Sequence, residues 1–284
     1  VVLLNASVGV LPAAGLPKIR VLATGGTIAG VQASATDYGY QSGTYDVNAL
    51  INAVPNINKL AVITGEQVAN IGSQDMNDAV WLTLAKRVNA LLAEAETDGV
   101  LITHGTDTLE ETSYFLSLVT KSAKPVVMVG SMRPATAISA DGPGNLYNGM
   151  AVATNPGAKG RGTLVVLNDE IHFARNVVKT HTTSVQTFRS INRGPAGLVN
   201  TGKVFWFGPL DRKFGPDGEF SVDNLDRLPR VDIIYAHANM SIDLIDAAIA
   251  HGAKGLVIAG VGDGNMTMPA LERLTKAAKS GIVV

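Results

Sequence analysis

The chain of 284 residues contains no cysteine. This absence excludes disulfide bonds, thiolate nucleophiles and metal sites with cysteine ligands. Histidine is also scarce, because only five are present, at positions 104, 172, 181, 237 and 251. They show no metal-ligand spacing such as HExxH. We therefore expect each histidine to be structural or solvent-facing, and we expect no bound metal.

The chain also has little net charge. Its formal charge is −1, and 17% of its residues are charged. Proteins that bind nucleic acids or anionic membranes usually carry a marked excess of positive charge, so we expect neither partner. Beyond the first residues, no apolar run approaches the roughly 20 residues that cross a bilayer. The sequence therefore predicts no membrane span.

The first residues differ in composition from the rest. Residues 1–4 and 8–11 are apolar, and the small-residue stretch LPAAG follows before the first expected strand. This order resembles the end of a secretory signal peptide with its cleavage region. We expect 1–16 to be such a remnant, and a disordered extension is the alternative.

The rest of the chain divides into two expected domains. A length of 284 residues fits one large or two ordinary domains at roughly 100–200 residues each. Residues 209–230 hold glycine, proline and many charges, which favours a linker. We expect a larger domain over 17–208 and a smaller α/β domain over 231–284. Because the latter stops at an expected strand over 281–284, we expect it to be incomplete.

Strand and helix patterns alternate through the larger domain. Short apolar runs predict strands over 19–23, 60–63, 66–71, 100–102, 125–129 and 163–168. Helical spacing predicts helices over 47–54, 80–92, 109–119 and 146–154. This alternation predicts the α/β class, with a mostly parallel, doubly wound sheet. The alternation of strands and helices stops over 169–207, where short β-like segments follow one another.

The stretch GVLITHGTDTLEET (99–112) joins a buried strand to a helix through a tight polar turn. Thr106 and Asp107 are therefore expected at the carboxyl end of a strand, where open α/β sheets bind ligands. Thr108 and Glu111 fit the capping box that starts a helix. The alternative is that the side chains of Thr106 and Asp107 only satisfy hydrogen bonds of the turn and the cap.

A second turn of interest follows the first expected strand. TGGTIAG (24–30) places two glycines before Thr27, so the backbone can turn with positive φ beside exposed N–H groups. The pattern matches neither GxGxxG nor a phosphate-binding loop, so support for a dinucleotide site is weak. Residues 31–45 are small and polar with three tyrosines and no periodicity, which is typical of a mobile lid.

Three further residues are candidates because of their neighbours. Ser73 and Gln74 stand in a polar turn before a helix, whose N–H groups favour an anion such as a carboxylate. Lys179 is the only cation between Arg175 and Arg189, and it is set among hydroxyl residues. The alternatives are ordinary turn chemistry for the first two and an exposed lysine for the third.

Taken together, these segments resemble the bacterial L-asparaginase family, specifically its secreted type II enzymes. TGGTIAG and ITHGTDTLEET are similar to the two signature segments of that family. The resemblance extends from position 17 to the end through GEQVANIGSQDMND, KPVVMVGSMRP, SADGPGNLYN and AGVGDGN.

The resemblance implies roles for particular residues. Thr27 would be the nucleophile that attacks L-asparagine, and Tyr40 would assist it. Thr106 would be the second catalytic threonine, with Asp107 and Lys179 as its partners. The resemblance further implies an acyl-enzyme intermediate, some glutaminase activity and no cofactor. Such hydrolysis needs only a nucleophile, a base and oxyanion donors.

The resemblance also implies how the substrate is held and where the protein acts. Ser73, Gln74 and Asp107 match the positions that bind the carboxylate and amino group of the substrate. The family implies a homotetramer with active sites at subunit interfaces, in the periplasm or secreted. Two departures stand out: Asp263 occupies a position that is often asparagine, and the glutamate that a neighbouring subunit contributes lies beyond residue 284.

Two rival functions use the same features. A two-domain ligand-binding protein without catalysis would use the same edge of the sheet but would need neither Thr27 nor Lys179. An amidohydrolase of larger amides would normally carry further domains. The GSQD segment at 72–75 is more similar to asparagine-preferring members of the family than to glutaminase-asparaginases.

Overall fold

A computed structural model describes residues 15–37, 39–208 and 214–284 of the chain. The chain divides into two compact units between Asn224 and Leu225. The expected signal-peptide remnant or extension at 1–16 lies almost wholly outside the described residues, as do residues 209–213 of the expected linker. From 214 to 230 the described chain forms neither helix nor strand.

An eight-stranded sheet organises the first unit, in the order β10-β9-β6-β5-β4-β3-β1-β2. Five strands run parallel: β1 (Lys18–Gly25), β2 (Val62–Ile71), β3 (Gly99–Thr103), β4 (Val126–Val129) and β5 (Thr163–Leu167). Three antiparallel strands extend it: β6 (Glu170–Phe173), β9 (Gly197–Asn200) and β10 (Lys203–Trp206). The prediction of a mostly parallel α/β sheet is therefore confirmed.

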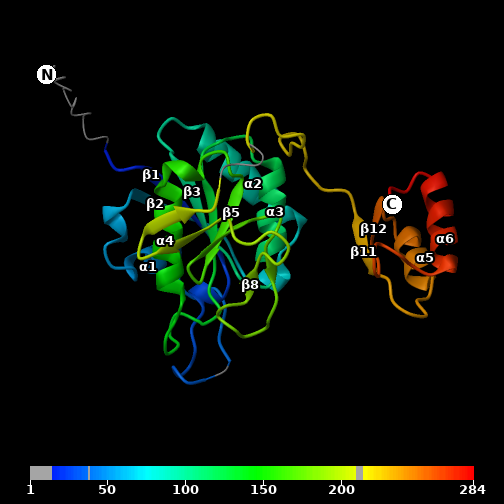
Figure 1. Cartoon of the computed structure of the whole chain (residues 1–284), viewed down its shortest axis with the longest axis horizontal. Coiled ribbons are helices and arrows are strands. Elements are labelled where there is room, and N and C mark those ends of the chain that lie inside the picture. Colours follow the sequence, from blue (N-terminus) through cyan, green and yellow to red (C-terminus); the bar gives the residue numbers. More distant parts are fainter. Residues whose placement is uncertain (1–14, 38, 209–213) are drawn as a thin grey trace, which may run out of the picture. The chain divides into compact units, whose positions relative to one another are not determined.

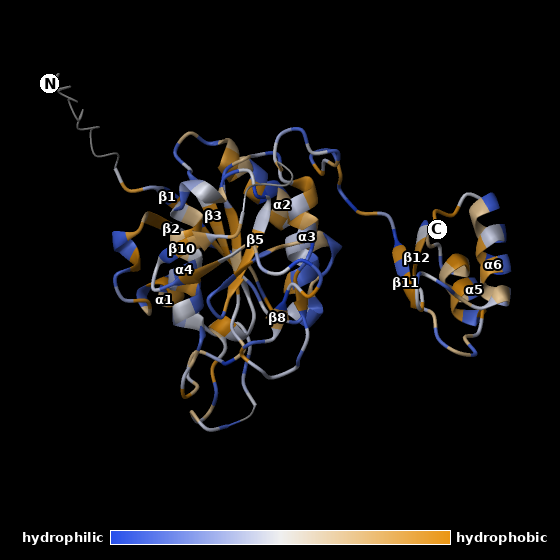
Figure 2. Cartoon of the chain, in the orientation of Figure 1, coloured by the Kyte–Doolittle hydropathy of each residue, from blue (hydrophilic) through white to orange (hydrophobic). Residues whose placement is uncertain are grey.

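Helices cover both faces of this sheet (Figure 1). One face packs on α1 (Val47–Asn52) and α4 (Gly142–Thr154), and the other on α2 (Asp78–Ala93) and α3 (Leu109–Val119). Because both faces are covered, β3 and β4 are buried along their whole length. Figure 2 shows the result, with apolar strands inside and polar loops and helix surfaces outside.

Short elements complete the first unit. Its described residues include the 3₁₀ turns η1 (Thr27–Ala29), η2 (Ile57–Lys59), η3 (Ser73–Asp75) and η4 (Pro156–Ala158). A separate two-stranded sheet pairs β7 (Val178–Lys179) with β8 (Phe188–Arg189).

The second unit is a small α/β layer with its own core. Its elements are β11 (Val231–Tyr235), α5 (Asp243–Ala250), β12 (Gly255–Ala259) and α6 (Met268–Lys279). The two strands are parallel, and Ile234 and Leu256 of the strands belong to one buried core with Ile245 of α5. None of the helices in the described parts of the chain is long and apolar enough to span a membrane.

Two strand predictions were wrong. The separate strands predicted over 60–63 and 66–71 form one continuous strand, β2, which stays in register with β1 through Gly65. Gly65 is a packing position there, because a β-carbon would come within 3.0 Å of Val47 on α1. The strand expected over 281–284 is a single bridge between Val283 and Gly255.

Candidate active site

The glycine turn after β1 carries Thr27. Gly25 and Gly26 have φ of 100° and 84°, which side chains rarely adopt. A β-carbon on Gly26 would lie 2.3 Å from Cα of Gly105 in the turn after β3. The two turns therefore touch through their backbones, and the buried Thr27 and Thr106 follow directly after the two glycines that meet.

Tyr40 reaches Thr27 from the loop over 31–45. Main-chain hydrogen bonds of 3.0 and 2.9 Å between Val31 and Gln41 close the base of this loop. The hydroxyl of Tyr40 lies 2.7 Å from Oγ1 of Thr27. The ring packs over Gly30, where a β-carbon would come within 2.8 Å of it. The loop is thus ordered at the end that carries Tyr40, although Tyr38 lies outside the described residues.

The turn after β3 is joined to η3 by two hydrogen bonds. The main-chain N–H of Asp107 donates to Oγ of Ser73 over 3.0 Å, and the hydroxyl of Thr108 donates to the Ser73 carbonyl over 2.7 Å. Thr108 stands at the N-cap of α3 without a capping hydrogen bond from its side chain. The prediction of a capping box is therefore wrong, because the Thr108 hydroxyl bonds to Ser73 and not to an N–H group of α3.

Lys179 joins the same turn from β7. Its Nζ donates to Oγ1 of Thr106 over 2.9 Å and to Oδ1 of Asp107 over 2.6 Å. The Lys179 side chain is 15% exposed, whereas that of Asp107 is 58% exposed. Asp107 therefore pairs with a mostly buried ammonium while much of its carboxylate faces solvent.

His104 fixes the backbone beneath this cluster. Burial lowers the pKa of His104 to about 4, so the imidazole is neutral near pH 7. Trp81 donates to Oγ1 of Thr112 over 2.8 Å, and that hydroxyl lies 3.0 Å from Nε2 of His104. Thr112 then donates to Nε2, which leaves Nδ1–H to donate to the Gly105 carbonyl over 2.7 Å. His104 precedes Gly105 in the sequence, but the hydrogen bond by which the His104 side chain holds the Gly105 carbonyl was not predicted.

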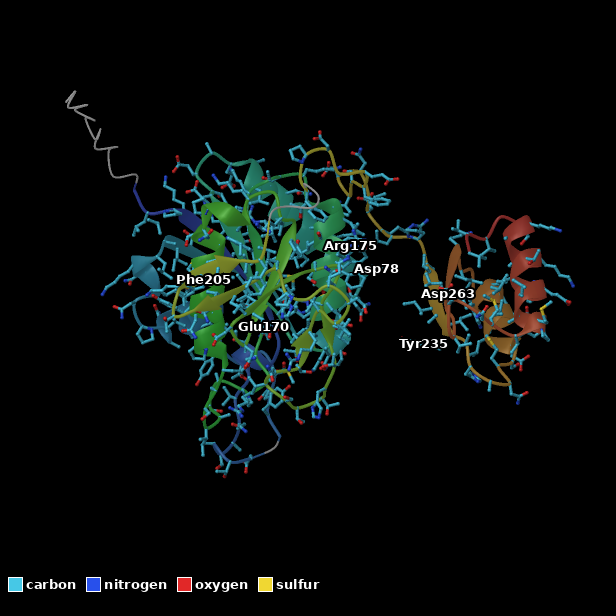
Figure 3. All side chains as sticks on the ribbon, in the orientation of Figure 1. Asp78, Glu170, Arg175, Phe205, Tyr235 and Asp263 are labelled. Carbon is cyan, nitrogen blue, oxygen red and sulfur yellow. The ribbon has the colours of Figure 1, made fainter. Side chains whose placement is uncertain are left out.

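One predicted site residue, Gln74, makes its side-chain contact outside the cluster of Ser73, Thr106, Asp107 and Lys179. Gln74 is exposed, folds back over Gly72 and donates to Oδ2 of Asp75 over 3.2 Å. Asp263 belongs to the second unit (Figure 3), in a turn closed by the bridge between Val261 and Asn265. Among the described residues, no three His, Asp or Glu side chains gather in a way that could hold a metal ion.

Comparison with known proteins gives consistent relatives. Residues 18–212 match the family model described as Asparaginase, N-terminal, and residues 230–284 match the Glutaminase/Asparaginase C-terminal domain. L-asparaginase 2 of Bacillus subtilis is 52% identical over 95% of this chain and 72% of its own length. The probable periplasmic L-asparaginase of Haemophilus influenzae is 50% identical over 99% of this chain and 80% of its own length.

A solved structure agrees with these sequences. The probable cytoplasmic L-asparaginase from Campylobacter jejuni superimposes with a TM-score of 0.90 at 47% identity, covering 94% of this chain and 82% of that one. The family models together span most of the chain, so the resemblance noted from the sequence is confirmed at the level of the family. The chain belongs to the asparaginase family.

Proposed function

We propose that this protein hydrolyses L-asparagine to L-aspartate and ammonia, with minor activity on L-glutamine. Family membership and relatives named L-asparaginase support the reaction class. The observation that carries the proposal is the contact between two hydroxyl-bearing turns, one holding the Thr27–Tyr40 pair and the other the Thr106–Lys179–Asp107 cluster.

Thr27 is the proposed nucleophile. Its Oγ1 attacks the side-chain amide carbon of asparagine while its proton passes to Tyr40, 2.7 Å away, and Tyr40 gives its own hydroxyl proton to the leaving nitrogen. The C–N bond then breaks as the nitrogen takes up a proton and leaves as ammonia, so an ester remains on Thr27. Main-chain N–H groups of the two touching turns are the proposed donors to the oxyanion, since backbone donors are already oriented before the reaction.

The Thr106–Lys179–Asp107 cluster is the proposed base. In its uncharged form the Lys179 amine takes the Thr106 proton across their 2.9 Å hydrogen bond, and Thr106 in turn deprotonates the water that attacks the ester. Asp107 orients the amine through its 2.6 Å contact. When water attacks the ester carbon, the bond between this carbon and Oγ1 of Thr27 breaks and aspartate leaves. The proton that Lys179 took up returns through Thr106 to Oγ1 of Thr27.

Ser73, Gln74 and Asp107 are the proposed binding residues for the α-carboxylate and α-amino groups. The exposed part of the Asp107 carboxylate supports its contact with a substrate ammonium. Gln74 would have to leave its contact with Asp75 to reach a substrate. A carboxylate that serves both Lys179 and the ammonium would link substrate recognition to the base.

We further propose a type II enzyme that acts in the periplasm or outside the cell as a homotetramer with active sites at subunit interfaces. The relative from Haemophilus influenzae is named periplasmic, whereas the one from Campylobacter jejuni is named cytoplasmic. Fractionation of the native host and light scattering of the purified protein test these two points. Recovery with cytosolic markers, or a monomer with full activity, would refute them.

Ammonia release from asparagine and from glutamine tests the reaction directly. We expect kcat/KM to be higher for asparagine. Binding of asparagine without release of ammonia would instead favour the ligand-binding alternative.

A further inference from the structure

The backbone at Lys179 lies outside the main sheet. Its strand, β7, has two residues, and among the described strands it pairs only with β8. Two-stranded ribbons of this length are only marginally stable without other contacts. The position of the Lys179 amine therefore depends on what holds this ribbon against the rest of the first unit.

The register of the ribbon leaves the Lys179 N–H available for such a contact. Lys179 pairs with Phe188, and the next pair along, Thr180 with Thr187, is joined by a main-chain hydrogen bond of 2.9 Å. Hydrogen-bonded and non-hydrogen-bonded pairs alternate along antiparallel strands. Lys179 is therefore in a non-hydrogen-bonded pair, and its N–H points away from the ribbon.

That N–H donates to Oε2 of Glu110 in the first turn of α3. Glu110 follows Asp107 by three residues, so the start of one helix contacts Lys179 at two points. Asp107 and Thr106 hold the amine, and Glu110 holds the main chain. All three contacts come from residues 106–110, that is, from the turn after β3 and the start of α3.

Glu110 is buried more than its neighbour. Burial raises the pKa of the Glu110 carboxyl, and the hydrogen bond from the Lys179 backbone opposes that rise. Glu111, the next residue on the same turn, is exposed. Both lie where the helix dipole favours a negative charge, so the dipole alone does not account for a partly buried carboxylate at position 110.

Glu110 and Lys179 also share a cavity of about 350 Å³ with Asp107, Thr180, His181 and Thr182. The titratable groups that face Glu110 here are Asp107, Lys179 and His181, with Glu111 beside it on the helix.

We propose that Glu110 is a positioning residue for Lys179: by accepting the Lys179 main-chain N–H, it sets how far the amine reaches toward Thr106. This inference rests on the proposed function, in which Lys179 is part of the base. It predicts that positioning of Lys179 requires a side-chain oxygen acceptor at the distance of the Glu110 carboxylate, whereas the negative charge of Glu110 is not required. Catalysis is sensitive to such displacement, since errors of about 1 Å cost up to about 100-fold in rate.

The first test measures the Lys179 amine without any use of turnover. Acetylation by acetic anhydride is followed at each lysine by peptide mass spectrometry in the full chain. We expect slow labelling of Lys179 in wild type and Glu110→Gln, and labelling at least about threefold faster in Glu110→Ala and Glu110→Asp. Lys159 and Lys203, both exposed, serve as internal references. Equal Lys179 rates in all four proteins would overturn the proposal.

The second test compares kinetics in the same variants with Glu111→Gln as the matched control. Glu110→Asp keeps the charge but is shorter by one methylene, and Glu110→Gln keeps the reach without the charge. We expect kcat to fall about tenfold or more in Glu110→Asp and Glu110→Ala with KM nearly unchanged, and to recover largely in Glu110→Gln. An active Glu110→Asp beside an inactive Glu110→Gln would show that charge is what matters and would overturn the proposal.

The two tests separate the inference from the proposed function. If wild type releases no ammonia from asparagine, the proposed function fails, whereas the labelling result still decides whether Glu110 positions Lys179. If wild type is active and labelling does not respond to Glu110→Ala or Glu110→Asp, the inference fails alone.

Discussion

The hydroxyl oxygens of Thr27 and Tyr40 lie 2.7 Å apart, although the first belongs to the turn after β1 and the second to the loop that follows it. This contact predicts that the two side chains act together. Tyr40→Phe, which keeps the ring over Gly30, should lower kcat at least about tenfold, about 1.4 kcal/mol of barrier. Thr27→Ala should lower kcat by more, with folding and substrate binding retained.

Tyr45→Phe is the matched control, because Tyr45 closes the same loop and donates its main-chain N–H to the Ala29 carbonyl over 3.0 Å. Its kcat should stay near that of wild type. The assignment of Thr27 as nucleophile fails if Thr27→Ala keeps more than about a tenth of wild-type kcat.

Thr106 and Lys179 should behave as one catalytic unit. Their side chains share a hydrogen bond of 2.9 Å, and removal of either breaks the same path for the proton. The double alanine variant should then be scarcely slower than the worse single variant, as for other groups that act together. Steady-state kinetics of the three variants measure this, and losses that multiply would show that the two residues act independently.

Asp107 should bind the substrate ammonium in addition to its contact with Lys179. Truncating one member of a buried charge pair costs about 2–5 kcal/mol, and the exposure of Asp107 places its contribution toward the lower end of that range. A substrate without the α-amino group should therefore be poor for wild type yet lose little more in Asp107→Ala. Comparable wild-type kcat/KM for the amino and deamino substrates would rule this role out.

The contact between the two glycine turns should be sensitive to a single methyl group. Gly26→Ala would put a β-carbon 2.3 Å from Gly105 Cα at a φ of 84°, so we expect a loss of several kcal/mol of stability or an inactive protein. In Gly144→Ala, on α4, nothing lies within 4 Å of the new methyl. That control should be neutral or more stable by up to about 1 kcal/mol. Urea unfolding of both variants gives the comparison.

Stability should fall in mild acid because of two buried histidines. Burial lowers the pKa of His104 to about 4, and burial together with Arg189 lowers that of His172 to about 4. Since the unfolded state binds a proton near pH 6.5, it binds more protons than the native state between about pH 6.5 and 4. The contribution of each histidine is complete above pH 6.5 and is lost as the pH falls through this window.

The expected loss is on the order of 2 kcal/mol per histidine between pH 7 and pH 5. Urea unfolding across this range measures it. His172→Gln should flatten the pH dependence, whereas His251→Gln, at an exposed position, should leave it unchanged. A free energy of unfolding that is constant or rises toward pH 5 would contradict the expectation.

The sequence by itself determined the fold class and the turns that carry the site. Alternating apolar runs and helical stripes specify strands and helices locally, and helices between successive strands favour parallel pairing of those strands. Glycine permits positive φ and close backbone approach because it has no β-carbon. The glycines before Thr27 and Thr106 therefore indicated the two turns from the sequence alone. Family resemblance added the roles proposed for the side chains.

Only the tertiary structure decided which of these side chains meet. Lys179 and Thr106 are 73 residues apart, and Glu110 and the Lys179 backbone are 69 apart; no local pattern encodes such pairs. Thr108 shows the difference most clearly, since its sequence predicts a helix cap while its hydroxyl donates to Ser73. Local propensity fixes how a segment folds, but the order of strands in the sheet decides which turns lie side by side, and a polar group then pairs with the partner that packing brings to it.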